Sequence, residues 1–195
     1  RFRSQALLDE GGLLTCMAYV DLNPMRSGAA KSLEGSEFTS IQERLREVGQ
    51  AAQKRRSGAK RNQGRRRQQE EGEAGRVDET GRLAELLPFA APDAEPGAVE
   101  RTQVPMLFDE YVALLRRTGA AIRDDQVDAL PPKLAAVVQR VGLEPAQFIA
   151  AVRDYSRTFF TMVGQVSRIE LEGARLGKQR VKGVGAASRL YRKAG

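Results

Sequence analysis

The chain has 195 residues, enough for one domain or for a small domain with appendages. Its single cysteine, Cys16, excludes an internal disulfide and a cysteine metal cluster, which fits a reducing cytoplasm. The formal net charge is +7 and no apolar run approaches the roughly 18 residues of a membrane span. We therefore expect a cytoplasmic protein that has no membrane partner.

The first predicted helix lies near the start of the chain. Residues 1–8 fit the end of a strand or a loop, and Asp9 is placed as a helix N-cap. Apolar residues then recur at helical spacing over residues 11–22. Pro24 disfavours helical geometry for the residue before it, Asn23, so the helix is expected to end there.

A second helix is predicted after a turn and loop over residues 26–38. Thr39 or Ser40 can cap it, and Glu43 is placed for a capping box. Ile41 and the apolar residues that follow at helical spacing would form its buried stripe.

Residues 50–82 consist mainly of Gln, Arg, Gly and Glu, so we expect them to be disordered or a frayed helix. The excess positive charge lies here: residues 54–67 carry eight positive charges, and without them the net charge of the chain would be −1 instead of +7. Such a run can attract phosphates without reading sequence, although a solvated linker with no dedicated partner is the alternative. The candidate DNA-binding residues in it are Lys54, Arg55, Arg56, Lys60, Arg61, Arg65, Arg66 and Arg67.

The C-terminal part has the pattern of a small helical bundle. A Pro- and Ala-rich linker over residues 88–105 precedes a predicted helix over 107–123. A short helix closed by Gly142 should follow, and then one long or two shorter helices over residues 144–177, with Pro145 in a first turn. The basic tail can form a final helix.

Tyr19 and Asn23 are four residues apart, so they lie on one face of the predicted first helix. A tyrosine oxygen can act as a covalent nucleophile, and an amide oxygen is a ligand that Mg²⁺ accepts. The pair could therefore place a nucleophile beside a cation that polarises a phosphate. The alternative is structural: Tyr19 would be a half-buried core residue and Asn23 a cap of the helix.

The residues around this pair carry a family resemblance. Residues 1–45, with "RFRSQALLDE" and "MAYVDLNPMR", closely resemble the REP-associated tyrosine transposases, relatives of the single-tyrosine HUH transposases. The mark of that family is a helix with Tyr-x-x-x-Asn-Pro-x-Arg, which Tyr19, Asn23, Pro24 and Arg26 match. Later segments, including "LPPKLAAVVQRVGL", resemble the long C-terminal extension of one bacterial subgroup.

The resemblance implies a DNA transposase that acts on single-stranded or hairpin DNA. The tyrosine at the Tyr19 position would form a 5′-phosphotyrosine, and Asn23 would be the third ligand of a divalent metal, Mg²⁺ or Mn²⁺. Arg26 would make a phosphate contact or an ion pair. In the family two histidines hold the metal, but this sequence contains no histidine. We therefore expect that this chain binds no such metal and does not cleave DNA alone.

The expected fold is mainly α. Residues 1–49 would be the C-terminal piece of an α+β, ferredoxin-like HUH catalytic domain, and the chain would be part of a longer protein. Residues 50–105 would be a basic linker and residues 106–195 a helical extension. Two alternatives remain open: a non-catalytic nucleic-acid-binding remnant, and a purely structural helical appendage. The sequence indicates neither the target DNA nor the oligomeric state.

Overall fold

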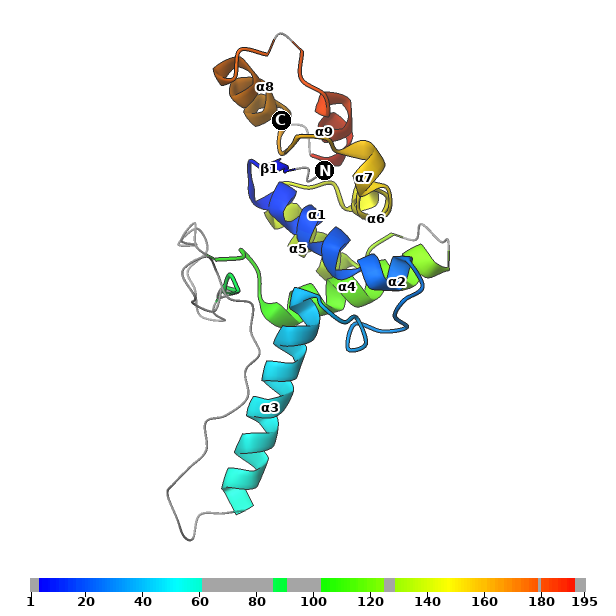
Figure 1. Cartoon of the computed structure of the whole chain (residues 1–195), viewed down its shortest axis with the longest axis vertical. Coiled ribbons are helices and arrows are strands. Elements are labelled where there is room, and N and C mark those ends of the chain that lie inside the picture. The colour runs from blue at the N-terminus through cyan, green and yellow to red at the C-terminus, as the bar shows by residue number, and fades with distance from the viewer. Residues whose placement is uncertain (1–3, 61–85, 91–102, 125–128, 179, 192–195) are drawn as a thin grey trace.

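The structure is a computed structural model that describes residues 4–60, 86–90, 103–124, 129–178 and 180–191. These residues are mainly helical, as predicted, and they contain one small sheet of two strands (Figure 1). None of the helices in this described part is both long enough and apolar enough to cross a lipid bilayer.

The N-terminal segment forms β1 (Ala6–Leu7) and α1 (Glu10–Asp21). Asp9 is the N-cap of α1, as predicted, and its Oδ1 accepts a hydrogen bond of 2.8 Å from the backbone N–H of Gly12. This bond satisfies one of the free N–H groups at the start of the helix.

The prediction that helical geometry stops before Pro24 is only partly right. α1 ends at Asp21, but α2 (Asn23–Arg26) begins at once with Asn23, and Leu22 between them also has helical dihedrals. Pro24 lies in the first turn of α2, where its missing N–H group removes no helical hydrogen bond. The proline therefore starts a new helical turn and does not end helical geometry.

α3 (Ser40–Lys60) is longer than expected. Residues 50–60, predicted as disordered or a frayed helix, have helical backbone, and the far end of α3 extends away from the other helices (Figure 1). Alanine, glutamine, lysine and arginine are all good helix formers, so this segment needs little tertiary packing to remain helical. The remaining residues of that predicted disordered segment, 61–82, lie outside the described part of the chain.

The C-terminal part adds helices and one strand. The prediction of one or two helices over residues 144–177 is wrong in its middle, where the chain becomes extended at Phe159 and forms a strand. Aromatic and β-branched residues are dense there, in "TFFTMV", and they favour extended backbone. The elements are α4 (Phe108–Arg123), α5 (Pro132–Arg140), α6 (Pro145–Arg153), α7 (Tyr155–Thr158), β2 (Met162–Val163), α8 (Val166–Arg175) and α9 (Val184–Leu190).

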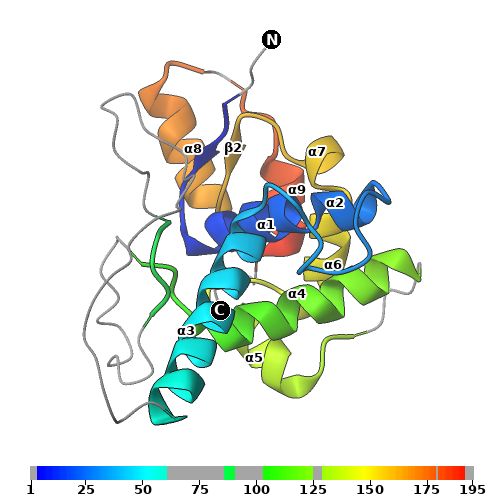
Figure 2. The same ribbon diagram turned by 60° about the horizontal axis from the view of Figure 1, so that its bottom comes forward.

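The two strands connect the N-terminal segment with the C-terminal half of the chain. β1 pairs in parallel with β2, with Ala6 opposite Met162 and Leu7 opposite Val163. Figure 2 shows these strands beside α8 and above α1. The N-terminal segment is therefore built into the C-terminal half of the fold.

One hydrophobic core combines residues from both predicted parts of the chain. Leu14 and Leu22 of the N-terminal part are fully buried together with Leu114 and Phe148 of the C-terminal part. The division at residues 49 and 106 stays a prediction, but the described ends of the linker also contact this core. Val104 is fully buried and forms a parallel bridge with Phe89.

Candidate functional site

Tyr19 lies in the last turns of α1, and its half-buried ring contacts two other side chains. It stacks on the ring of Tyr155, with centroids 4.7 Å apart and an interplanar angle of 23°. The guanidinium carbon of Arg26 lies 4.7 Å from the centroid of the same Tyr19 ring. Stacked aromatic and cation–π contacts each favour one orientation of the ring, so the phenol is held in place.

Arg26 is anchored from the other half of the fold. Its Nη2 donates a hydrogen bond of 2.7 Å to the backbone carbonyl of Arg153. Its Nη1 is buried and has no hydrogen-bond partner among the described residues. The guanidinium therefore places a positive charge beside the Tyr19 ring.

Asn23 is the first residue of α2, and it faces the same pocket as Tyr19. This pocket has a volume of about 310 Å³. The spacing of four residues thus brings the two predicted site residues together, even though a break between helices separates them. The pocket is lined by Tyr19, Val20, Asn23, Pro24, Glu37, Phe38 and Thr39.

The sequence reasoning missed Glu37, Phe38 and Thr39, which return to the tyrosine helix from the loop before α3. Phe38 is the most exposed of them, with 90% of its surface accessible, and its backbone φ is +63°. Few non-glycine residues adopt this left-handed region. The resemblance covers this segment, but nothing in its residue types indicates that the aromatic side chain is exposed.

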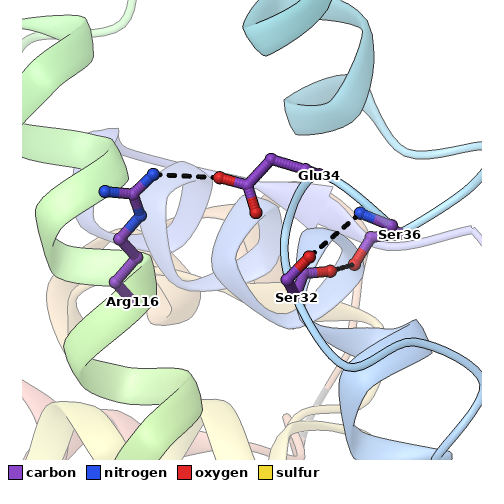
Figure 3. A network of polar contacts seen from close by, with 5 residues as sticks. Ser32, Glu34, Ser36 and Arg116 are labelled. Atoms are coloured by element: carbon purple, nitrogen blue, oxygen red, sulfur yellow. Dashed lines mark hydrogen bonds and ion pairs between the residues drawn. The ribbon is translucent and has the colours of Figure 1, made fainter.

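One hydrogen bond joins that loop to α4 and others brace it internally, as Figure 3 shows. Nη2 of Arg116 donates to Oε1 of Glu34 over 2.9 Å, and the Ser36 hydroxyl donates to the backbone carbonyl of Ser32 over the same distance. The pKa of the Glu34 carboxyl is lowered, first by its own backbone N–H and then by Ser32 and Arg116. The loop is therefore tied to α4 at Glu34 and closed internally by the bond between Ser36 and Ser32.

A buried carboxylate, Asp21, ties the tyrosine helix to its neighbours. It accepts hydrogen bonds from the Tyr111 hydroxyl at 2.7 Å, from the Ser40 hydroxyl at 2.9 Å and from the backbone N–H of Ile41 at 3.2 Å. Burial raises the pKa of Tyr111 well above its usual value, and Asp21 raises it further. Sequence reasoning did not identify Asp21, because its partners lie on α3 and α4.

The residues of the pocket do not complete the metal site that the resemblance implies. The Asn23 amide and the Glu37 carboxylate supply oxygen ligands of the kind that Mg²⁺ binds. No group of three or more His, Cys, Asp or Glu side chains suited to a metal occurs in the described ranges, and the sequence has no histidine. Further ligands would have to come from other residues.

The predicted basic run is placed only in part. Lys54, Arg55, Arg56 and Lys60 belong to the distal half of α3, and the pocket lies at the opposite end of that helix. A helix of this length spans about 30 Å, so these four residues are not part of the pocket itself. The remaining predicted DNA-binding residues, Arg61, Arg65, Arg66 and Arg67, lie outside the described residues.

Comparisons with protein-family models, with curated proteins and with solved structures found no match to this chain.

Proposed function

We infer that this chain is part of a DNA transposase that acts on single-stranded or hairpin DNA and uses Tyr19 as its nucleophile. The observation that carries this proposal is that Tyr19 and Asn23 line one pocket and that Arg26 lies over the Tyr19 ring, all three being motif residues of the resemblance. A phenol, an amide oxygen and a cation are the groups that phosphodiester cleavage by a tyrosine requires.

In the proposed reaction the Tyr19 oxygen attacks a DNA phosphorus. The new tyrosine–phosphorus bond replaces the bond to the 3′ oxygen of the neighbouring nucleotide. The phenol loses its proton, and the departing oxygen takes one up to become a 3′-hydroxyl. Arg26 supports this chemistry through its positive charge, which lies beside the Tyr19 ring and favours the negative charge of a phosphate there. Rejoining is the reverse attack of a 3′-hydroxyl on the phosphotyrosine.

The divalent metal of the transposase family that the chain resembles would polarise the phosphate, and Asn23 would contribute one of its ligands. The histidine pair of the family is missing from this sequence, so we propose no metal-assisted step for the chain alone. Without the metal, a phenol is a poor nucleophile at neutral pH, because a tyrosine has an ordinary pKa of about 10. The isolated chain should bind DNA and form no adduct.

Trapping the covalent adduct tests this function. Labelled single-stranded and hairpin oligonucleotides are incubated with Mn²⁺ or Mg²⁺ and either this chain or the longest reading frame that contains it. The longer protein should form a 5′-phosphotyrosine that Tyr19→Phe abolishes while DNA binding persists. Tyr155→Phe is the matched control, since it removes the hydroxyl of the neighbouring ring only. An adduct that survives Tyr19→Phe rules out the assignment.

The second candidate function is that of a non-catalytic nucleic-acid-binding protein. It is favoured by the absence of histidine together with the eight cations between residues 54 and 67. A longer reading frame that also lacks a histidine pair, with DNA binding retained, would favour this candidate over the transposase.

A further inference from the structure

The loop between α2 and α3 holds an aromatic side chain in water beside the pocket. Phe38 is 90% exposed, and its φ of +63° is unfavourable for an L residue with a large side chain. The ring gains almost no burial in this position, and the backbone conformation is not one that phenylalanine prefers. Unfavourable backbone conformations that persist in a structure are concentrated at functional sites.

Hydrogen bonds on both sides of Phe38 impose its conformation. The Thr39 hydroxyl donates to the backbone carbonyl of Ser36 over 2.6 Å and accepts from the backbone N–H of Gln42 over 3.4 Å. The Ser36 hydroxyl donates in turn to the backbone carbonyl of Ser32 (Figure 3). Leu33 of the same loop is buried. The backbone of Phe38 is therefore held in one conformation, and a partner would not have to order the loop on binding.

The side chains that line the pocket disfavour a phosphate and favour a nucleobase. No lysine or arginine is among the described residues that line it, and the Glu37 carboxylate would repel a phosphate. Its apolar lining comes from Tyr19, Val20, Pro24 and Phe38, and the Asn23 and Glu37 that also line it carry hydrogen-bonding groups. Unpaired nucleobases stack on aromatic rings and present donors and acceptors along their edges.

We propose that this pocket binds one unpaired nucleobase of single-stranded DNA, stacked on Phe38, with its edge hydrogen-bonded to Asn23 and Glu37. The phosphate attached to that nucleotide then lies toward Tyr19 and Arg26. This inference rests on the proposed function and adds to it a base-binding site next to the reacting phosphate.

The carboxylate also predicts a base preference. An ionised Glu37 only accepts hydrogen bonds, so it pairs with the exocyclic amino groups of cytosine, adenine or guanine. Thymine has no such amino group, and its one donor, N3–H, lies between two carbonyl oxygens that a carboxylate repels. Oligonucleotides of cytosine or adenine should therefore bind more tightly than thymine oligonucleotides of the same length, and Glu37→Gln should reduce the difference.

The sequence contains no tryptophan, so Phe38→Trp places a single fluorescent probe in the site. Its emission should be quenched when single-stranded oligodeoxynucleotides bind, because a base stacks on the indole. Leu171→Trp is the control: Leu171 is 73% exposed on α8, which lies at the opposite end of the molecule from α3 in Figure 1. In parallel, fluorescence anisotropy with labelled oligonucleotides compares the unmodified chain with Phe38→Ala. Loss of one stacked base should weaken binding about 5-fold or more.

The outcomes separate this site from the proposed function. Quenching in the Phe38→Trp variant but not in the Leu171→Trp variant, with weaker binding by Phe38→Ala, supports the site. DNA binding that Phe38→Ala leaves unchanged, without quenching in the Phe38→Trp variant, overturns the site and leaves the proposed function standing. A chain that binds no single-stranded DNA overturns both. Self-association that Phe38→Ala abolishes and that DNA does not compete with also overturns the site, because a second copy would then cover Phe38.

Discussion

The ring of Tyr19 stacks on the ring of Tyr155, with centroids 4.7 Å apart and planes inclined by 23°. The candidate nucleophile is therefore oriented by a residue of α7, in the C-terminal part of the chain. The hydroxyl of Tyr155 donates in turn to Oε1 of Gln5 over 3.0 Å, which links the stack to the segment before α1. A C-terminal extension that held only a separate function would not need to contact the tyrosine helix in this way.

Two variants of Tyr155 separate the stack from the hydrogen bond. Tyr155→Ala removes a ring that is only 2% exposed, so the free energy of unfolding should fall by about 3–5 kcal/mol. Tyr155→Phe keeps the ring and loses the hydroxyl with its bond to Gln5 and its interaction with Cys16, so the loss should be about 1 kcal/mol. Urea unfolding measures both. Equal losses in the two variants would contradict a stabilising stack.

Alkaline pH should destabilise the fold through its buried tyrosines. Burial raises the pKa of Tyr111, Tyr155 and Tyr191, helped by Asp21, by Cys16 and by Asp9 respectively. Above pH 10 the unfolded chain releases these phenol protons while the folded chain retains them, so the unfolded state binds fewer protons. The free energy of unfolding must then decrease as pH rises, by about 1.4 kcal/mol per pH unit for each tyrosine.

Denaturant unfolding at a series of pH values, with tyrosinate absorbance recorded in parallel, checks this slope. Tyr191→Phe should reduce it by the share of one tyrosine. A stability that stays constant between neutral pH and the alkaline range would show that these phenols ionise as easily in the folded chain as in the unfolded one.

A double-mutant cycle tests the buried pair of Asp21 and Tyr111. Asp21→Ala leaves the Tyr111 hydroxyl and the Ile41 N–H without their acceptor, so it should cost about 3 kcal/mol or more. Tyr111→Phe removes one donor to the carboxylate and should cost less. The double variant should be more stable than the sum of the single losses implies, by about 1–3 kcal/mol, because the two groups interact directly. Additive losses would mean that the hydrogen bond contributes nothing.

Local patterns predicted the parts of the fold that depend on neighbouring residues. The cap at Asp9, the helix over residues 107–123 and the first-turn position of Pro145 all follow from spacing and residue type. Helical periodicity also predicted that Tyr19 and Asn23 share a face, and both line one pocket, although Asn23 belongs to α2 and not to α1.

Contacts between distant segments could not be predicted from those patterns. The pairing of β1 with β2 involves two residues on each side, too few to leave a period in the sequence. Asp21 and Tyr155 acquire their roles only from partners on other helices. The exposed ring of Phe38 depends on a loop conformation that hydrogen bonds and Leu33 determine together.

The left-handed backbone of Phe38 makes a specific stability prediction. Phe38→Gly should leave the free energy of unfolding unchanged or raise it by up to about 1 kcal/mol. Relief of the φ of +63° outweighs the added entropy of the unfolded chain, and the exposed ring loses little burial. Phe38→Ala keeps the unfavourable φ and should be the less stable of the two variants. A glycine variant that is clearly less stable than the alanine variant would contradict this account of the loop.

The salt dependence of DNA binding should separate three kinds of contact. Each cation that neutralises a phosphate of single-stranded DNA contributes about −0.7 to the slope of log affinity against log salt concentration. Replacing the eight cations between Lys54 and Arg67 with glutamine should weaken binding and flatten this slope by several units. Arg26→Ala removes one candidate phosphate contact and should change the slope by about 0.7 at most. Phe38→Ala removes no charge, so it should lower affinity equally at every salt concentration. Anisotropy titrations over a series of salt concentrations measure all three variants. A slope that the eightfold substitution leaves unchanged would remove the basic run from the interface and leave DNA binding to the pocket around Tyr19.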